Sequence, residues 1–282
     1  MIVDRKVAAV TGAGSGIGRA LALALAERGC RLALADVDAA GLVQTAAAAA
    51  AHGAQVTTAS VDVADRAAVY AWAEQVLAGY GQINLIFNNA GVALSTTIEG
   101  ADYADLEWIM NVNFWGVVHG TKAFLPHLKA SGDGHVINIS SVFGLFAQPG
   151  MSAYNASKYA VRGFTEALRQ ELELEGMGVS ATCIHPGGVR TAIARNSRVA
   201  DNMRAITGTD AARARAAFEK LLVTTPEHAA KRILKAVERN QRRLLIGVDA
   251  YLQDAMQRLL PTAYQRILLA ALRQRRAGRR PG

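Results

Sequence analysis

The chain has 282 residues, of which 51% are hydrophobic, and it carries a formal net charge of +8. This length suits one well-packed domain, and no apolar run reaches the roughly 20 residues of a membrane-spanning helix. The first residues lead into an apolar strand without the apolar core of an export signal, and only two cysteines occur, so we expect a cytoplasmic protein with reduced thiols.

The positive charge is concentrated at the C-terminal end. Residues 231–282 contain 13 Lys and Arg against three acidic residues, whereas residues 1–230 contain 18 against 20. The arginine cluster at the terminus, residues 273–280, lacks the aromatic residues of a nucleic-acid surface, so we expect no nucleic-acid partner. We favour a helix that covers a subunit interface or the mouth of a pocket over one that contacts anionic lipid.

Short apolar runs alternate with longer amphipathic stretches over the first 190 residues. The expected strands are 7–10, 32–35, 56–61, 83–87, 136–139 and 179–184. The expected helices are 17–28, 39–52, 65–79, 105–129 and 152–175. Apolar strands separated by helices predict an α/β fold with a doubly wound, Rossmann-like parallel sheet covered on both faces.

The alternation weakens after residue 190. Thr225 before Pro226 is typical of a helix start, and we expect a helix to about 239, a strand over 244–246 and two amphipathic helices separated by Pro261. We therefore predict a single domain with an extension. Residues 1–248 would hold the catalytic and cofactor sites together, and residues 249–282 would form a basic helical extension.

A glycine-rich turn, TGAGSGIG over residues 11–18, follows the first expected strand. Its spacing is G-x-x-x-G-x-G through Gly12, Gly16 and Gly18, which differs from the G-x-G-x-x-G of long-chain Rossmann enzymes. Glycines allow a sharp turn and the close approach of a ligand, and the N–H groups that begin the next helix attract a pyrophosphate. The turn therefore predicts a dinucleotide site.

Asp36 ends the second expected strand, 18 residues after Gly18. A carboxylate there accepts hydrogen bonds from both ribose hydroxyls of an adenosine and repels a 2′-phosphate. Val37 follows it, and the glycine turn contains no basic residue, so the pattern favours NAD over NADP. The alternative role for Asp36 is to begin a helix, which Asp38 fills equally well.

Further motifs follow in chain order, mostly at the ends of expected strands. They are Asp62-Val63, Asn88-Asn89-Ala90-Gly91, Asn111-Val112-Asn113, Ser140-Ser141, Tyr154-Asn155-Ala156-Ser157-Lys158, and Pro186-Gly187 with Thr191. Together with the glycine turn, they resemble the short-chain dehydrogenase/reductase family over about residues 5–247. Each motif alone is weak, but their combination and order are specific.

The resemblance implies a catalytic tetrad of Asn113, Ser141, Tyr154 and Lys158. Ser141 lies 13 residues before Tyr154, the usual spacing of the family, and Ser140 is the alternative.

The resemblance also implies the cofactor contacts. Asp62 and Val63 would hold the adenine, Asn89 and its neighbours would stabilise the sheet and line the cofactor, and Val189 and Thr191 would meet the nicotinamide amide. The full expected set comprises Gly12, Ser15, Gly16, Ile17, Gly18, Asp36, Asp62, Val63, Asn89, Ala90, Gly91, Tyr154, Lys158, Pro186, Gly187, Val189 and Thr191.

Tyr154 and Lys158 are four residues apart on an expected helix, so both project from one face. A free tyrosine, with a pKa of about 10, is a poor base near neutrality. An ammonium about 5 Å away stabilises the phenolate by about 3 kcal/mol at an effective dielectric of about 20, which lowers the pKa of Tyr154 by about two. Tyr154 would then exchange a proton with an alcohol while hydride passes to or from the nicotinamide.

The other members of the tetrad would assist this proton transfer. Ser141 would donate a hydrogen bond to the substrate oxygen. Lys158 would also bind the nicotinamide ribose, and Asn113 would hold a water that relays the proton onward.

The expected pocket is mostly apolar, which favours a hydrophobic alcohol or ketone. Its walls would be residues 92–94, the segment after Ser141, and residues 192–222 as a lid, with Arg195 and Arg198 as candidate cations. The segment after Ser141 contributes Val142, Phe143, Leu145, Phe146 and Gln148. The six histidines offer no pair at metal-ligand spacing, so we expect no metal.

The leading hypothesis is an NAD-dependent oxidoreductase that interconverts a hydrophobic secondary alcohol and its ketone, with Tyr154 as general acid and base. The alternatives are an NADP-dependent carbonyl reductase, and a non-catalytic protein on the same fold that senses a dinucleotide or docks on membranes. Proteins of the last kind tend to lose the tyrosine or the lysine, and both are present. From the family we expect a homotetramer built through the long helices 105–129 and 152–175, or a dimer if the C-terminal extension blocks one interface.

Overall fold

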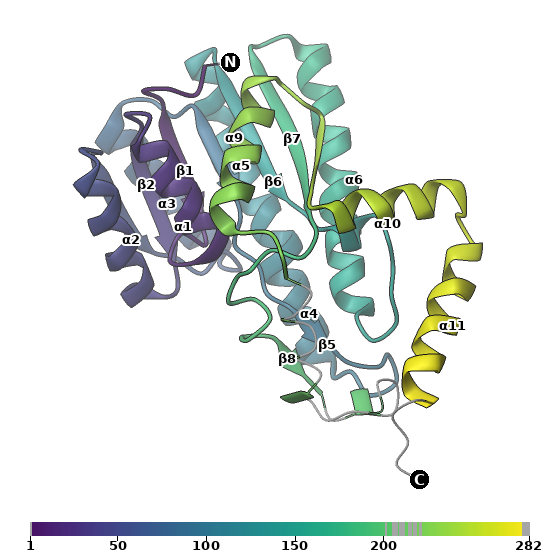
Figure 1. Cartoon of the computed structure of the whole chain (residues 1–282). Coiled ribbons are helices and arrows are strands. Elements are labelled where there is room, and N and C mark those ends of the chain that lie inside the picture. The colour runs from purple at the N-terminus through teal and green to yellow at the C-terminus, as the bar shows by residue number, and fades with distance from the viewer. Residues whose placement is uncertain are drawn as a thin grey trace.

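The computed structural model describes residues 2–200, 202–204, 208, 212–213, 216, 219 and 222–277, with the backbone alone for 275–277 (Figure 1). Its main sheet has seven parallel strands in the order β3-β2-β1-β4-β6-β7-β9. These strands are β1 (Val7–Thr11), β2 (Arg31–Asp36), β3 (Val56–Ser60), β4 (Leu85–Asn88), β6 (Gly134–Ile139), β7 (Val179–Pro186) and β9 (Arg243–Ile246). The strand order reverses between β1 and β4, which confirms the predicted doubly wound sheet.

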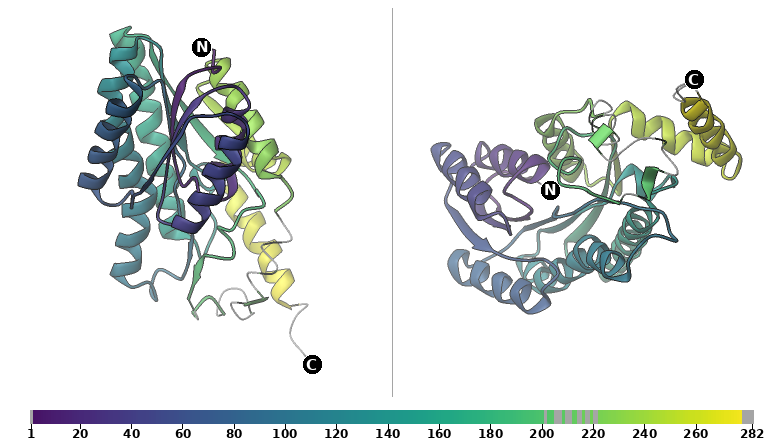
Figure 2. Two further views of the ribbon diagram at one scale, coloured as in Figure 1. Left: turned by 90° about the vertical axis from the view of Figure 1, so that its left-hand side faces the viewer. Right: turned by 90° about the horizontal axis from the view of Figure 1, so that it is seen from below.

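Helices cover both faces of this sheet, as the apolar strands require (Figure 2). One face carries α1 (Gly16–Ala26), α2 (Ala39–Ala51) and α9 (Pro226–Glu238), and the other carries α3 (Arg66–Tyr80), α5 (Gly116–Ser131) and α6 (Ser152–Glu175). The side chains of β1, β4 and β6 are buried throughout, whereas the edge strand β3 is largely exposed. The predicted helices and strands are therefore confirmed to within a few residues at their ends, except for the single helix expected over 105–129.

Local signals account for the start of α9. Thr225 accepts a hydrogen bond from His228 N at 3.1 Å, and Pro226 occupies the first helical turn, where its missing N–H has no partner to lose. The C-terminal segment continues as two helices that break at Pro261, as predicted.

Two features of the fold lie outside the sequence expectations. The single helix expected over 105–129 is divided into α4 (Tyr103–Met110), a π-helical turn over Asn111–Trp115, and α5. A small second sheet pairs β5 (Leu94–Ser95) with β8 (Arg198–Val199) in parallel. Its strands of two residues are too short to show a periodic pattern in the sequence.

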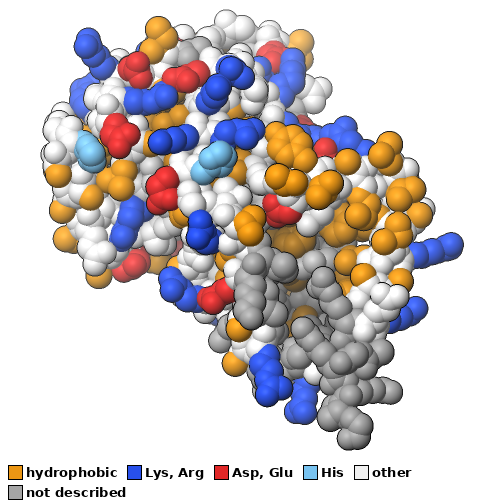
Figure 3. All heavy atoms as spheres, in the orientation of Figure 1, with side chains coloured by type: hydrophobic (Ala, Val, Ile, Leu, Met, Phe, Trp, Pro, Cys, Tyr) orange, Lys and Arg blue, Asp and Glu red, His pale blue; other side chains and the backbone are white. Residues whose placement is uncertain are grey.

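The C-terminal helices, α10 (Val248–Leu259) and α11 (Ala263–Ala277), project from the side of the body (Figures 1 and 2). Hydrophobic side chains gather over these two helices on the face shown in Figure 3. We refer to residues 248–277 as the C-terminal arm. No helix in the described part of the chain combines the length and the apolar character needed to cross a bilayer.

Candidate active site

The glycine turn between β1 and α1 can be built only with glycine. Gly12 and Gly16 have φ values of +64° and +54°, in the left-handed region that L side chains rarely adopt. A Cβ on Gly18 would lie 2.0 Å from the carbonyl oxygen of Gly12. Ser15 precedes α1 and makes no side-chain hydrogen bond to its first turn, where Ile17 lies, so that turn has N–H groups to offer an anion.

Asp36 lies at the end of β2, directly beside this turn. Its Oδ2 accepts a hydrogen bond from Gly14 N at 2.7 Å, and its Oδ1 accepts one from Asp38 N at 2.9 Å. The helix-capping role belongs to Asp38, which accepts from Gly41 N at 3.0 Å at the start of α2. Asp36 is therefore not a helix cap, and its carboxylate is half-buried at the carboxyl edge of the sheet.

Arg19 supports the turn from behind, a role that the motif analysis missed. Its guanidinium donates to Gly14 O at 2.7 Å, to Gly41 O at 3.2 Å and to Thr45 Oγ1 at 2.9 Å. These bonds fasten the turn to α2 and engage the guanidinium with the protein's own acceptors. The only signal in the sequence is a basic residue directly after the last glycine.

The ends of β1 and β4 are tied together by Thr11 and Asn89. The Asn89 side chain donates to Thr11 O at 2.9 Å and to Gly12 O at 3.2 Å. In return, Thr11 Oγ1 accepts from the backbone N–H groups of Asn89 and Ala90 at 3.0 and 3.1 Å. The motif after β4 thus holds the glycine turn in place from the other side.

Two expected adenine contacts follow β3. Asp62 is exposed and accepts from Ala64 N at 2.9 Å, whereas Val63 is buried. A Cβ on Gly116 would lie 2.7 Å from Val63 Cγ2, so the loop packs closely on the start of α5.

Tyr154 and Lys158 lie on α6 and are both buried. The Tyr154 hydroxyl lies close enough to the side chain of Ser141 for that side chain to lower the pKa of Tyr154. Lys158 Nζ lies 5.9 Å from the centre of the Tyr154 ring and donates to Ile139 O at 3.1 Å. The helix therefore brings the two predicted side chains to one place, beside the end of β6.

The structure distinguishes between the two candidate serines. Ser140 Oγ donates to the carbonyl of Lys158 at 2.8 Å, so it is engaged with the backbone of α6. Ser141 Oγ accepts from Phe143 N at 3.1 Å and lies beside Tyr154. The geometry agrees with the choice of Ser141.

His185 supports Ser141 from the end of β7. Its Nδ1 lies 2.9 Å from Ser141 O, and because a carbonyl only accepts, Nδ1 must carry the proton. The ring is fully buried, which lowers the pKa of His185 to about 4 and keeps it neutral. His185 is thus a support for the backbone at Ser141.

Asn113 lies in the π-helical turn between α4 and α5 and is completely buried. Its Nδ2 donates to Val92 O at 3.0 Å and to Ser157 Oγ at 3.1 Å, while its Oδ1 accepts from Val92 N at 2.8 Å. A Cβ on Gly91 would lie 3.1 Å from Asn113 Oδ1 and 3.4 Å from Lys158 Nζ. Asn113 thus joins α5, α6 and the loop after β4 beside Lys158.

The expected lowering of the Tyr154 pKa is wrong for this structure. Burial raises the pKa of Tyr154, and the side chain of Ser141 opposes this rise only in part. Burial also lowers the pKa of Lys158 to about 8. Burial away from water disfavours both the phenolate and the ammonium, and the spacing of the two residues in the sequence does not reveal this desolvation cost.

The turn after β7 carries the expected nicotinamide contacts and lies against the glycine turn. A Cβ on Gly16 would approach Thr191 Cγ2 to 2.9 Å, so the two loops meet at that point. Val189 forms a parallel bridge with Thr224. Pro186 ends β7, and Gly187 donates its N–H to Ile246 O at 2.8 Å.

Asp249, from the first turn of α10, fixes this same loop and was missed by the sequence analysis. Its Oδ2 accepts from Gly188 N at 2.7 Å. A Cβ on Gly187 would lie 2.2 Å from that oxygen, so the carboxylate needs glycine beneath it. An acidic residue in the first turn of a helix is common, and nothing in the sequence shows that it reaches a loop 61 residues earlier.

The family model described as short chain dehydrogenase matches residues 6–202 of this chain. The chain belongs to the short-chain dehydrogenase family. SadH of Mycobacterium tuberculosis, which bears the name of an oxidoreductase, is 51% identical over 270 residues, 95% of this chain and 96% of SadH.

Solved structures agree with the assignment to short-chain dehydrogenases. A family member from Burkholderia phymatum, in complex with NAD, has a TM-score of 0.82 and 32% identity over 96% of each chain. An alcohol dehydrogenase from Thermococcus sibiricus, complexed with 5-hydroxy-NADP, has a TM-score of 0.70 and 25% identity over 86% of this chain and 95% of its own. The chain is an oxidoreductase of this family, and its relatives include binders of either dinucleotide.

The segment after Ser141, an expected wall of the substrate pocket, packs against α11. The rings of Phe146 and Tyr264 lie 4.5 Å apart, and Tyr264 Oη accepts from Ala147 N at 3.3 Å. Arg198, one of the two candidate cations, is bound to Asp105 at 2.5 Å and stacks on Trp108 at 3.7 Å. The expected lid, 192–222, lies partly outside the described residues.

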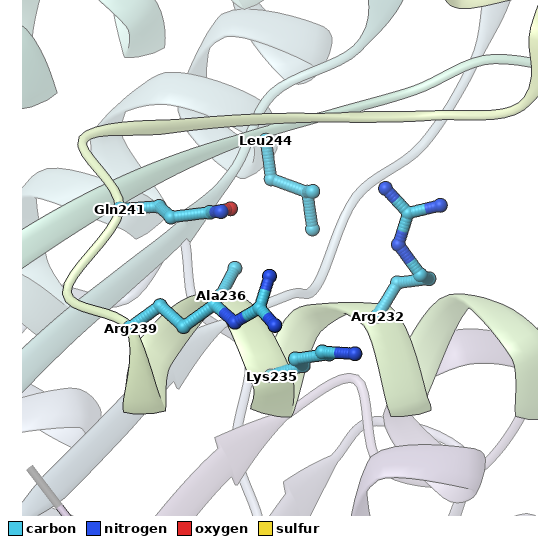
Figure 4. A pocket seen from close by; sticks show the side chains of 6 residues that line it. All are labelled: Arg232, Lys235, Ala236, Arg239, Gln241 and Leu244. Atoms are coloured by element: carbon cyan, nitrogen blue, oxygen red, sulfur yellow. The ribbon is translucent and has the colours of Figure 1, made fainter.

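A basic pocket of about 280 Å³ lies away from these residues, between α9 and β9 (Figure 4). It is lined by Arg232, Lys235, Ala236, Arg239, Gln241 and Leu244. Since α9 covers the face of the sheet opposite to α6, this pocket contains none of the expected tetrad. Its cationic side chains lie on the solvent side of a surface helix, so the pocket gives no support for a catalytic role.

Proposed function

We propose that this chain is an NAD-dependent dehydrogenase that interconverts a hydrophobic secondary alcohol and its ketone. The observation that carries the proposal is that α6 buries Tyr154 beside Ser141, with Lys158 Nζ 5.9 Å from the tyrosine ring. A tyrosine hydroxyl beside a serine can move a proton to or from an oxygen that approaches both. The loop after β4, in which Gly91 lies near Lys158 Nζ, is at the same carboxyl edge of the sheet as the glycine turn.

In this mechanism Ser141 donates a hydrogen bond to the substrate oxygen and holds it beside the Tyr154 hydroxyl. Tyr154 removes the alcohol proton in one direction and returns it in the other. Asn113 has both amide hydrogens bonded to protein acceptors, so its part is to order the loop at Val92 and the helix at Ser157 around Lys158. The bound nicotinamide supplies the hydride acceptor and donor.

Lys158 assists by its charge. The pKa of Lys158 is about 8, so at lower pH its side chain is an ammonium, which favours the tyrosinate. Its position beside Gly91 suits a contact with the cofactor ribose. Since burial raises the pKa of Tyr154, this assistance is needed for Tyr154 to act as a base near neutrality.

NAD is preferred over NADP because Asp36 faces the glycine turn with an acceptor-only carboxylate. Arg19, the basic residue directly after the turn, already donates to four protein oxygens. The Burkholderia phymatum relative solved with NAD supports the same choice. The glycine turn and the first turn of α1 would hold the pyrophosphate.

The hydrophobic substrate class rests on the side chains next to Tyr154. Phe143 packs edge-on to Tyr154 with ring centres 6.1 Å apart, and Leu94 and Met151 are buried in the same apolar cluster. We also propose that α5 and α6 form subunit contacts in a homotetramer, since Trp115 and Tyr159 are exposed on that side.

The experiment measures NADH formation at about 340 nm with a panel of hydrophobic secondary alcohols. Tyr154→Phe should lower kcat/KM by about a thousandfold, because the group that moves the proton is removed. Tyr159→Phe is the matched control: it lies on the same helix, has an exposed fraction of 37%, and should keep full activity. Full activity in Tyr154→Phe would show that the proposal is wrong.

The cofactor preference is tested in the same assay with NADP. Asp36→Ala should lower kcat/KM for NAD by about tenfold or more and leave NADP better tolerated, because the ribose acceptor and the repulsion of the phosphate are both removed. An unchanged ratio of the two cofactors would contradict the role given to Asp36.

A further inference from the structure

The helix α10 is apolar on its outward side. Val248, Leu252 and Leu259 have exposed fractions of 76%, 63% and 79% and lie along one stripe of the helix. Its inner side carries Asp249 and Gln253 beside the buried Ala250: both polar side chains are half-buried, and each has a sheltered oxygen without a partner in the described part of the chain. This polarity is the reverse of that expected for a surface helix in water.

The apolar surface continues onto α11. Leu260 follows α10 directly, and Ile267 and Leu269 on α11 are exposed to 50% and 41%. Figure 3 shows these two helices as a region rich in hydrophobic side chains, with Lys and Arg at its outer edge. A contiguous apolar surface of this kind marks a site that contacts something other than water.

The arm is attached to the body at both of its helices. Asp249 binds Gly188 N at 2.7 Å at the start of α10. Tyr264 packs on Phe146 and accepts from Ala147 N at 3.3 Å on α11. These contacts use the inner sides of the helices and so hold the apolar stripe outward.

The charge of the arm indicates which partner it fits. No acidic residue follows Asp254 in the sequence, whereas seven arginines do: Arg258, Arg266, Arg273, Arg275, Arg276, Arg279 and Arg280. Two copies paired arm to arm would bring two such basic segments together, which is repulsive. An anionic surface that also accepts apolar side chains would satisfy both properties.

We propose that the C-terminal arm docks on an anionic phospholipid bilayer. Val248, Leu252 and Leu259 enter the boundary between headgroups and acyl chains, and Arg266 and Arg273 contact the lipid phosphates. Because Tyr264 joins the arm to the loop after Ser141, docking holds the substrate side of the molecule towards the bilayer. The proposal does not depend on the chemistry of the site, since binding is scored without turnover.

The test is co-sedimentation of the full chain with vesicles of phosphatidylcholine that contain about 30% phosphatidylglycerol, against vesicles of pure phosphatidylcholine. We expect binding to the anionic vesicles only, and a loss of binding when NaCl rises from about 50 mM to about 300 mM. The double variant Leu252→Ser/Leu259→Ser should lower the partition coefficient by about tenfold or more. Arg266→Gln/Arg273→Gln should lower it by about tenfold.

Leu174→Ser is the matched control, because Leu174 is 89% exposed near the end of α6 and lies outside the arm. It should bind as the unchanged chain does. Equal binding to neutral and anionic vesicles, or an equal loss in Leu174→Ser, would overturn the proposal. So would an oligomer that Leu252→Ser/Leu259→Ser dissolves while no vesicle binding occurs, since the stripe would then belong to a second copy.

Discussion

The carboxyl edge of the sheet and the C-terminal arm use the same residue types in opposite ways. At the edge, polar side chains are buried and each has a defined partner: Asn113 bonds to Val92 and Ser157, and Ser141 accepts from Phe143 N. In the arm, large apolar side chains of α10 face outward, whereas Asp249 and Gln253 face the body beside the buried Ala250. The polar groups of the edge are paired with one another, whereas the arm has an apolar surface that no other part of the described chain covers.

The comparison also separates stability from function. Burial lowers the pKa of Lys158 to about 8, so its ammonium is held at a cost in folding free energy, whereas burial raises the pKa of Tyr154 and favours its neutral form. Perturbed pKa values of this kind are typical of functional sites. Three predictions test these features, and the last of them tests the link between the edge and the arm.

The largest expected effect concerns Lys158→Met. The pKa of Lys158 is about 8 in the folded chain against an ordinary value of 10.5, so the unfolded chain binds its proton more tightly, and the penalty is fully present below pH 8. Removal of the ammonium should lower kcat/KM by about a thousandfold and raise the free energy of unfolding at pH 7 by about 1–3 kcal/mol. Urea unfolding and steady-state kinetics on the same preparation measure both.

Lys122→Met is the control for the loss of a lysine, since Lys122 is exposed on α5. It should change neither quantity. A loss of stability in Lys158→Met would mean that the bond from Nζ to Ile139 O outweighs the cost of burying the charge.

Motifs located the edge well because its residues are fixed by local chain geometry. The glycine turn, Asp36 and the pair Tyr154 and Lys158 lie at strand ends or one helical turn apart, so their meeting follows from a parallel sheet. The contacts of Arg19 with Thr45 and of Asp249 with Gly188 depend on tertiary packing between elements, which no spacing encodes. The sign of the Tyr154 pKa shift also depends on burial depth and could not be derived from separation alone.

A second prediction concerns the acid side of the stability profile. His135 and His185 are buried, and burial lowers their pKa values from 6.5 to about 3 and about 4. Between pH 6.5 and pH 4 the unfolded chain binds more protons, so stability should fall with falling pH by up to about 1.4 kcal/mol per pH unit for each histidine.

His185→Gln should flatten this dependence, because glutamine keeps a donor towards Ser141 O but does not titrate. Thermal unfolding from pH 4.5 to pH 7 measures the slope. His52→Gln, on an exposed helix end, should leave it unchanged. An unaltered slope in His185→Gln would show that His185 does not titrate on unfolding in this range.

The smallest expected effect tests whether the arm belongs to the site. Asp249→Ala removes the acceptor for Gly188 N, leaves that donor unpaired beside the loop that carries Val189 and Thr191, and should raise KM for NAD about fivefold with kcat nearly unchanged. Asp249→Asn keeps an acceptor oxygen and should restore most of the affinity, which a general loss of packing would not allow. Asp254→Ala, which breaks only the ion pair with Arg258 on the same helix, should not alter KM. If all three variants behave alike, the arm is independent of the cofactor loop, and the boundary predicted at residue 248 divides the chain in function as well as in sequence.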